Sequence, residues 1–170
     1  MKSYLIVDGY NIINSWTNLK KIVNENMEEA RDRLIEILAD YRAYRGVEVI
    51  LVFDAHFVKG NQQKEEFVHG IKVVFTKEHE TADSYIERIV HNLSKYNFVQ
   101  VATSDWAEQI TILSGGGVRI SARELEEEIK DSHKKMKRKF INQEVQNDDL
   151  SHRIEPHILE KLEKWRKRED

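Results

Sequence analysis

Short runs of apolar residues alternate along this chain with longer segments in which apolar residues recur every three or four positions. Uninterrupted apolar runs are typical of strands that are buried on both faces of a parallel sheet. We predict about five strands, at residues 4–8, 47–53, 71–75, 98–103 and 118–120. Because strands and helices alternate, the predicted fold class is α/β, with a mainly parallel sheet and right-handed crossovers.

The segment between the first two strands has the pattern of one long helix. Apolar residues recur on a single helical face over residues 25–44, namely at Met27, Ala30, Leu34, Ile37, Leu38 and Tyr41. Gly46 follows this stretch and is expected to end the helix, because glycine adopts the left-handed conformation of a helix C-cap at little cost.

Capping residues mark the starts of three later helices. Thr81 is a predicted N-cap, which places Asp83 in the first turn of its helix. Ser104 is the predicted N-cap of the next helix, which Asp105 would open. Ser121, followed three residues later by a glutamate, has the spacing of a capping box.

Two polar stretches are predicted to lack regular structure. Residues 55–70 are expected to form a long loop, in which Lys59 could reach a substrate phosphate. Residues 143–151 are expected to link the main body to a last helix that begins near Pro156. We therefore expect a domain over residues 1–142, followed by a polar linker and a basic C-terminal helix over residues 143–170.

Composition narrows the class of protein. The chain has 170 residues, of which 40% are hydrophobic and 34% are charged, and this suits one domain with a full core. It has no cysteine, which excludes disulfides and cysteine-based zinc sites. No apolar run approaches the roughly 20 residues needed to span a bilayer, and no signal peptide precedes the first strand. We expect a cytoplasmic protein that does not enter a membrane.

Aspartates stand at the ends of the predicted strands or just beyond them, at Asp8, Asp54, Asp83 and Asp105. Ligands of open α/β sheets bind at this edge. Any one of these residues could instead be a helix cap or a first-turn acid, but four crowded carboxylates would repel one another strongly. A divalent cation relieves that repulsion, and oxygen ligands suit Mg²⁺ or Mn²⁺. Such a site serves the metal-assisted attack of water on a phosphodiester.

Five short motifs resemble, in the right order, the YacP-like branch of the NYN-domain family of PIN-like nucleases. They are Val-Asp-Gly-Tyr-Asn at 7–11, Val-Phe-Asp at 52–54, Val-Val-Phe-Thr at 73–76, Glu-Thr-Ala-Asp at 80–83 and Ala-Thr-Ser-Asp at 102–105. The resemblance covers roughly residues 3–140. It implies a Rossmann-like three-layer α/β/α fold, an acidic cluster that binds Mg²⁺ or Mn²⁺, and endonuclease action on RNA. The expected substrate is mRNA, either free or on the ribosome.

The resemblance also implies roles for individual residues. Asp8 and Asp83 match the central metal-binding acids, Asp105 matches a third, and Asp54 matches an acid nearer the rim. Asn11 corresponds to the polar residue after the first acid, and Ser104 corresponds to the hydroxyl beside the last one. The chain departs from the family pattern just after Asp54, where Ala55-His56 replaces an expected glycine, and this concerns the loop on the substrate side.

Basic residues are concentrated near the C-terminus. On the helix after Ser121, Met136 and Phe140 are expected to face inward. That would leave a basic segment toward solvent, formed by Lys134, Lys135, Lys137 and Arg138. A second basic block covers residues 161–168. Such blocks are often interaction segments, so we expect contact with RNA or the ribosome, although a merely solvated helix face would show the same pattern.

Other protein classes fit the sequence less well. A phosphatase of the haloacid dehalogenase type needs a second aspartate where this chain has Tyr10. A receiver domain needs paired acids after the first strand and a lysine late in the sheet, and neither is present. The alternative from a different functional class is an inactive RNA- or ribosome-binding module of the same fold. Four retained acids argue against it, because clustered negative charge does not help to bind a polyanion.

Overall fold

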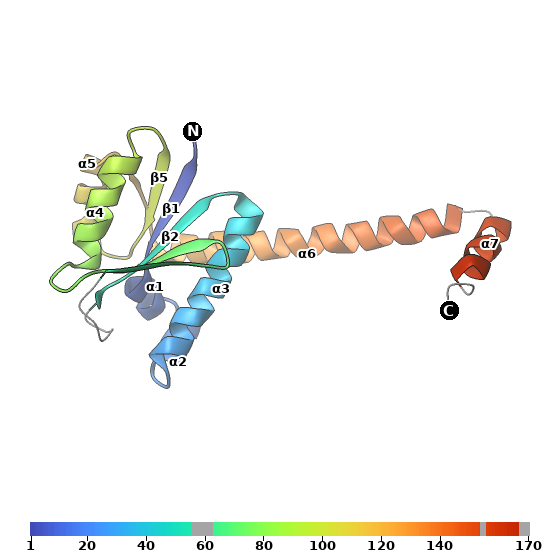
Figure 1. The fold of residues 1–170 in the computed structure, drawn as a ribbon, viewed down its shortest axis with the longest axis horizontal. Coiled ribbons are helices and arrows are strands. Elements are labelled where there is room, and N and C mark those ends of the chain that lie inside the picture. The colour runs from blue at the N-terminus through green and yellow to red at the C-terminus, as the bar shows by residue number, and fades with distance from the viewer. Residues whose placement is uncertain (56–62, 154–155, 167–170) are drawn as a thin grey trace. The chain divides into compact units, whose positions relative to one another are not determined.

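The computed structural model describes the backbone of residues 1–55, 63–153 and 156–166, and the side chains of 1–55, 63–147 and 160–165. The chain divides into two compact units, residues 1–130 and 131–170. The first unit contains the whole sheet and most of the helices (Figure 1).

The first unit is built on a six-stranded sheet with the order β3-β4-β2-β1-β5-β6. Its strands are β1 (Ser3–Asp8), β2 (Glu48–Phe53), β3 (Lys64–Val68), β4 (Ile71–Phe75), β5 (Phe98–Ala102) and β6 (Val118–Ile120). All neighbouring strands are parallel except β3 and β4. β1 lies in the middle, between β2 and β5, so its carboxyl end is flanked by two other strand ends.

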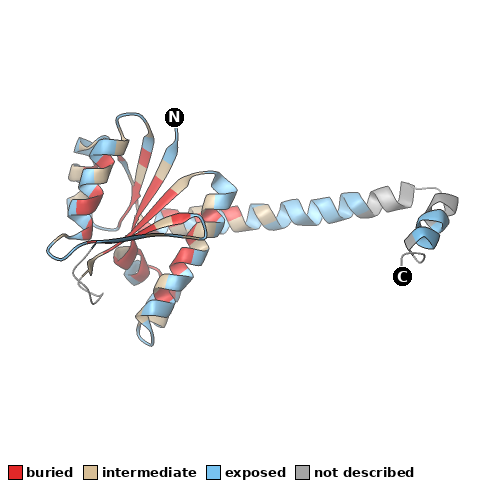
Figure 2. Cartoon of the chain, viewed as in Figure 1, coloured by how far each residue is buried: buried red, intermediate tan, exposed pale blue. Residues whose placement is uncertain are grey.

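Helices cover both faces of the sheet and complete the predicted three-layer α/β/α fold. One face carries α1 (Gly9–Ser15), α2 (Thr17–Val23), α3 (Met27–Arg45) and the beginning of α6 (Ala122–Arg153). The other face carries α4 (Ala82–Leu93) and α5 (Trp106–Ser114). Buried residues lie along the strands and on the inward faces of these helices (Figure 2).

The five predicted strands are all present, and the structure adds one more. The predicted loop over residues 55–70 is wrong for β3, which pairs antiparallel with β4 at the edge of the sheet. Its first three residues are charged, and none of its residues is fully buried. An edge strand of this kind lacks the apolar run that marks a central strand.

Most of the predicted helix signals are confirmed. Gly46 ends α3 with φ 66°, and Thr81 caps α4 by accepting a hydrogen bond from the Ser84 backbone N–H. The Ser121 capping box forms in both directions. The prediction for α5 is wrong by one residue, because its N-cap is Asp105 rather than Ser104.

The second unit differs from expectation. The stretch predicted as a linker, residues 143–151, is helical and belongs to α6, so the predicted boundary at 142/143 falls inside a helix. That stretch has no Gly or Pro to end the helix. Phe140, expected to face inward, is 67% exposed. α7 (Pro156–Arg166) follows, and no helix in the described ranges is both long and apolar enough to cross a membrane.

Candidate active site

Three carboxylates meet at the carboxyl edge of the sheet. Asp8 is the last residue of β1, Asp83 lies in the first turn of α4, and Glu108 lies in the first turn of α5. One carboxylate oxygen from each lies within 4.8 Å of the other two. We call these residues the acidic triad. It is the arrangement expected where ligands bind to an open α/β sheet.

Burial and mutual repulsion perturb the acidic triad. Asp8 is only 9% exposed, and burial, followed by the charge of Asp83, raises its pKa to about 7. The nearby charges of Asp54 and Asp105 contribute to this rise, and the Asn11 backbone N–H opposes it. Asp8 stands at the N-cap position of α1, but its side chain makes no well-formed capping hydrogen bond. The Asn11 backbone N–H lowers the pKa of Asp8 by less than burial raises it, so helix capping offsets only part of the cost of burying this carboxylate.

Glu108 shares the perturbed environment of Asp8. Burial raises the pKa of its carboxyl group well above the ordinary range, and a hydrogen bond to Asp83 and the charge of Asp8 add to the rise. Its Oε2 atom is buried and has no hydrogen-bond partner among the described residues. Apart from the Thr103 hydroxyl, an ionised carboxylate in this position lacks, among the described residues, the donors that normally compensate for burial.

The donor set fits a hard divalent cation. The triad supplies only carboxylate oxygens, which are the ligands that Mg²⁺ and Mn²⁺ prefer. A cation would neutralise the repulsion that adds to the effect of burial on both pKa values, and it would satisfy the unpartnered oxygen of Glu108. The residues present therefore suit Mg²⁺ or Mn²⁺.

Two of the predicted metal ligands lie beside the acidic triad rather than in it. Asp54, directly after β2, accepts a hydrogen bond of 3.4 Å from the Ala82 backbone N–H, so it holds the start of α4. Asp105 accepts a hydrogen bond of 2.8 Å from the Ala107 backbone N–H and caps α5. Both are close enough to raise the pKa of Asp8, and each also positions a helix that carries a triad residue.

Asn11 and Ser104, the two predicted polar site residues, are joined to each other. The Asn11 side-chain oxygen accepts a hydrogen bond of 2.7 Å from the Ser104 backbone N–H. Ser15 extends this connection, because its hydroxyl lies 3.3 Å from the Ser104 hydroxyl and donates to the Asn11 carbonyl. These contacts link α1 to the loop between β5 and α5.

Gly9 lets the chain turn sharply after Asp8. A Cβ atom at this position would collide with the ring of Phe53, which is completely buried. The glycine therefore allows α1 to start directly against the core, and it fixes where the carboxylate of Asp8 emerges from β1.

Glu108 and Thr103 are site residues that the sequence analysis did not identify. The buried Thr103 hydroxyl hydrogen-bonds Glu108 and accepts the Asp105 backbone N–H at 3.1 Å. The spacing of Asp105 and Glu108 gives a signal that could have identified the glutamate. Residues at the N-cap and three positions later lie on the same side of a helix start, as in a capping box.

A cavity of about 190 Å³ opens beside the acidic triad, between α4 and α5. Acidic side chains from both helices line it, namely Asp83, Glu87, Asp105 and Glu108. A substrate phosphate could approach this negative surface only with cations present.

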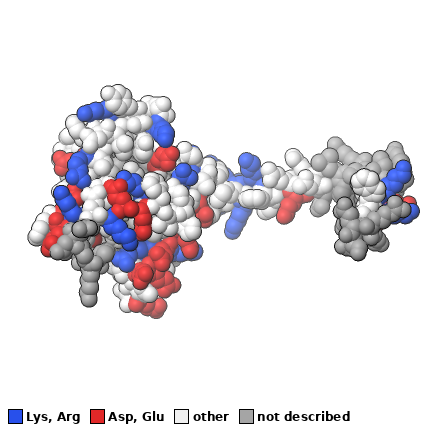
Figure 3. Space-filling model, in the orientation of Figure 1, with Lys and Arg blue, Asp and Glu red and all other residues white. Residues whose placement is uncertain are grey.

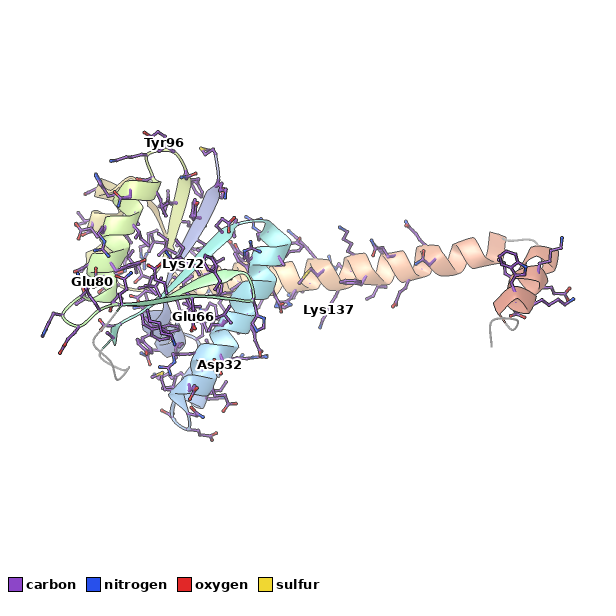
Figure 4. All side chains as sticks on the ribbon, viewed as in Figure 1. Asp32, Glu66, Lys72, Glu80, Tyr96 and Lys137 are labelled. Carbon is purple, nitrogen blue, oxygen red and sulfur yellow. The ribbon has the colours of Figure 1, made fainter. Side chains whose placement is uncertain are left out.

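The predicted RNA-binding residues lie elsewhere. Lys59 is outside the described residues. The basic segment, Lys134, Lys135, Lys137 and Arg138, is exposed on α6 within the second unit. Figure 3 shows basic side chains along this helix, and Lys137 extends away from it in Figure 4.

Comparisons with known proteins agree with the fold. The model of the YacP-like NYN domain matches residues 5–167. The uncharacterized protein YacP of Bacillus subtilis (strain 168) is 41% identical over 164 residues, which are 96% of each chain. A crystal structure of Rae1 (YacP) from Bacillus subtilis matches with a TM-score of 0.72 and 40% identity, over 96% of this chain and 94% of that one. The crystal structure of a mutant of Rae1 matches with a TM-score of 0.68 and 42% identity, over 79% of each chain. This chain therefore belongs to the YacP-like NYN-domain family, and its α/β fold is that of a PIN-like nuclease domain.

Proposed function

We propose that this protein is a divalent-metal-dependent endoribonuclease. The observation that carries the proposal is the convergence of Asp8, Asp83 and Glu108 within 4.8 Å at the carboxyl edge of a PIN-like sheet. Burial with few compensating donors makes this arrangement costly for the fold alone. A function that requires concentrated negative charge explains why the cost is maintained.

The acidic triad would hold Mg²⁺ or Mn²⁺. When bound, such a cation supplies a Lewis acid that polarises a phosphodiester and lowers the pKa of water. Thr103 orients Glu108, while Asp54 and Asp105 fix the helices that carry Asp83 and Glu108. Asn11 and Ser104 act as positioning residues, because their hydrogen bond ties the turn after β1 to the turn after β5.

The proposed substrate is RNA, and we extend this to cytoplasmic mRNA that is either free or engaged by the ribosome. The exposed basic segment of α6 supplies positive charge that the catalytic edge lacks. Contacts between basic side chains and phosphates hold an RNA chain without reading its bases. The proposal therefore separates binding on α6 from cleavage at the acidic triad.

Cleavage of a labelled RNA with Mg²⁺ or Mn²⁺ tests this function. Asp83→Asn and Glu108→Gln should each abolish cleavage and weaken Mn²⁺ binding, measured by calorimetry, while the circular dichroism spectrum stays unchanged. Glu87→Gln is the matched control, because Glu87 lines the same cavity on α4 but is not in the triad. Undiminished cleavage by both triad variants would contradict the assignment. If wild type binds RNA but neither binds Mn²⁺ nor cleaves, the inactive RNA-binding module is the better interpretation.

A further inference from the structure

Trp106 is an exposed aromatic residue at the start of α5, the helix that carries Glu108. It is the first residue of α5 and directly follows Asp105, whose charge acts on Asp8. Its side chain is 73% exposed, whereas Trp16 in the core is 4% exposed. An indole as exposed as this one adds little to the hydrophobic core.

Arg119, from β6, lies against the Trp106 indole. Its guanidinium carbon is 5.1 Å from the centre of the ring, which is the geometry of a cation–π contact. The Nε atom of Arg119 is buried and has no hydrogen-bond partner in the described part of the chain. The guanidinium thus supports the ring from one side, and the high exposure of Trp106 leaves the rest of the ring available.

The exposed face of α5 continues beyond Trp106. Ile110 and Leu113 follow at helical spacing and are 73% and 53% exposed, so the helix presents an apolar strip. A protein could cover such a strip. RNA is the better candidate for the end of the strip that Trp106 forms. An indole supported by an arginine offers both a stacking surface and positive charge, on the helix that carries Glu108.

We propose that Trp106, supported by Arg119, is a platform on which one nucleobase of single-stranded RNA stacks next to the acidic triad. This inference rests on the proposed action on RNA and specifies the substrate as unpaired. A base inside a duplex has no free face for the indole, so paired RNA would not use the platform. Stacking tolerates any base, so the platform would position the chain without selecting a sequence.

Binding of a short single-stranded RNA tests the platform without relying on cleavage. In an Asp83→Asn background, which keeps the RNA intact, Trp106→Ala should weaken binding by roughly 5- to 150-fold, and Trp106→Phe should restore most of the affinity. Ile110→Ala is the matched control, because Ile110 is equally exposed one turn along the same helix face. It should bind RNA like the parent.

Fluorescence distinguishes direct stacking from an indirect effect on the fold. The chain has three tryptophans, and Trp16 is buried, so a Trp165→Phe background leaves Trp106 as the exposed indole. RNA should then quench the emission. A series of RNAs that each lack one base, at successive positions, locates the stacked base. Removal of the base at one position should weaken binding to the protein that has Trp106, and it should have no such effect on binding to Trp106→Ala.

The outcomes separate this inference from the proposed nuclease function. Unchanged RNA affinity in Trp106→Ala, or equal losses in Trp106→Ala and Ile110→Ala, overturns the platform even if the acidic triad cleaves RNA. A Trp106-dependent stacking signal supports the platform even if no cleavage is found. If Trp106→Ala leaves the RNA affinity intact, a protein becomes the better candidate for covering the apolar strip.

Discussion

The side-chain oxygen of Asn11 accepts a 2.7 Å hydrogen bond from the backbone N–H of Ser104, although the two residues are 93 positions apart. The bond joins the turn after β1, which carries Asp8, to the loop that leads into α5, which carries Glu108. The relative position of two triad residues therefore depends on a hydrogen bond that involves neither of them.

Asn11→Ala should disturb the site more than it disturbs the fold. Loss of one hydrogen bond to a partly exposed loop should cost about 1 kcal/mol in the free energy of unfolding. Because the loop before α5 would no longer be held against the turn after β1, Mn²⁺ affinity and kcat should fall by about tenfold or more. Calorimetry and single-turnover cleavage measure the two effects.

Asn14→Ala provides the control for this prediction. Asn14 is exposed on the same short helix, so its replacement changes the composition of α1 without touching Ser104. Equal Mn²⁺ affinity and kcat in the two variants would show that the connection between Asn11 and Ser104 does not position the site.

Asp8→Asn should stabilise the metal-free protein, and the gain should depend on pH. Burial and Asp83 raise the pKa of Asp8 from 3.8 to about 7, so the folded state holds a proton more tightly than the unfolded state between these values. The unfolding free energy of wild type therefore falls as pH rises through this window. This loss of unfolding free energy is absent below pH 3.8 and complete above about pH 7. A shift of roughly three pKa units limits the loss to about 4 kcal/mol.

Urea unfolding in EDTA at about pH 5 and pH 8 measures this effect. The advantage of Asp8→Asn over wild type should be larger at the higher pH. Asp32→Asn serves as the control, because Asp32 is an exposed aspartate on α3 (Figure 4). An Asp8→Asn advantage that does not change between the two conditions would contradict the raised pKa of Asp8.

The cleavage products should carry 5′-phosphate and 3′-hydroxyl ends. The acidic triad is suited to activate water, and no histidine joins it in the described part of the chain. Attack by the RNA 2′-hydroxyl would instead leave a 2′,3′-cyclic phosphate. Adaptor ligation that requires a 5′-phosphate detects the expected ends, with alkali-treated RNA as the control for cyclic ends. Cyclic termini in the enzymatic products would indicate a different mechanism.

The sequence predicted the parts of the site that follow directly from strand ends. Asp8 ends an uninterrupted apolar run, and Asp83 follows a recognisable N-cap, so parallel topology alone brings them to one edge. The only local signal for Glu108 is its position three residues after Asp105, and the predicted N-cap at Ser104 obscured it. Glu108 joins the triad because α5 begins at Asp105 rather than one residue earlier and because Thr103 orients its side chain. Such contacts depend on tertiary packing.

The errors in the fold have a similar origin. β3 is a strand because β4 offers it a hydrogen-bonding edge, and its exposed charged residues carry no apolar pattern of their own. α6 continues through residues 143–151 because nothing in that polar stretch ends a helix. In both places polarity suggested a loop, whereas polarity reports exposure and not the backbone conformation.

The exposed basic segment of α6 leads to the last prediction. Replacing Lys134, Lys135, Lys137 and Arg138 with glutamine should weaken RNA binding for all sequences alike, because phosphate contacts do not read bases. The dependence of log K on log salt should flatten by up to about 0.7 for each phosphate of single-stranded RNA that a basic side chain no longer neutralises. Cleavage of RNA that is already bound should change little, since the acidic triad is intact.

The control is Lys20→Gln with Lys21→Gln, which removes exposed positive charge from α2. If affinity and salt slope both match those of this control, α6 does not hold the substrate, and the positive charge that attracts RNA must lie elsewhere on the chain.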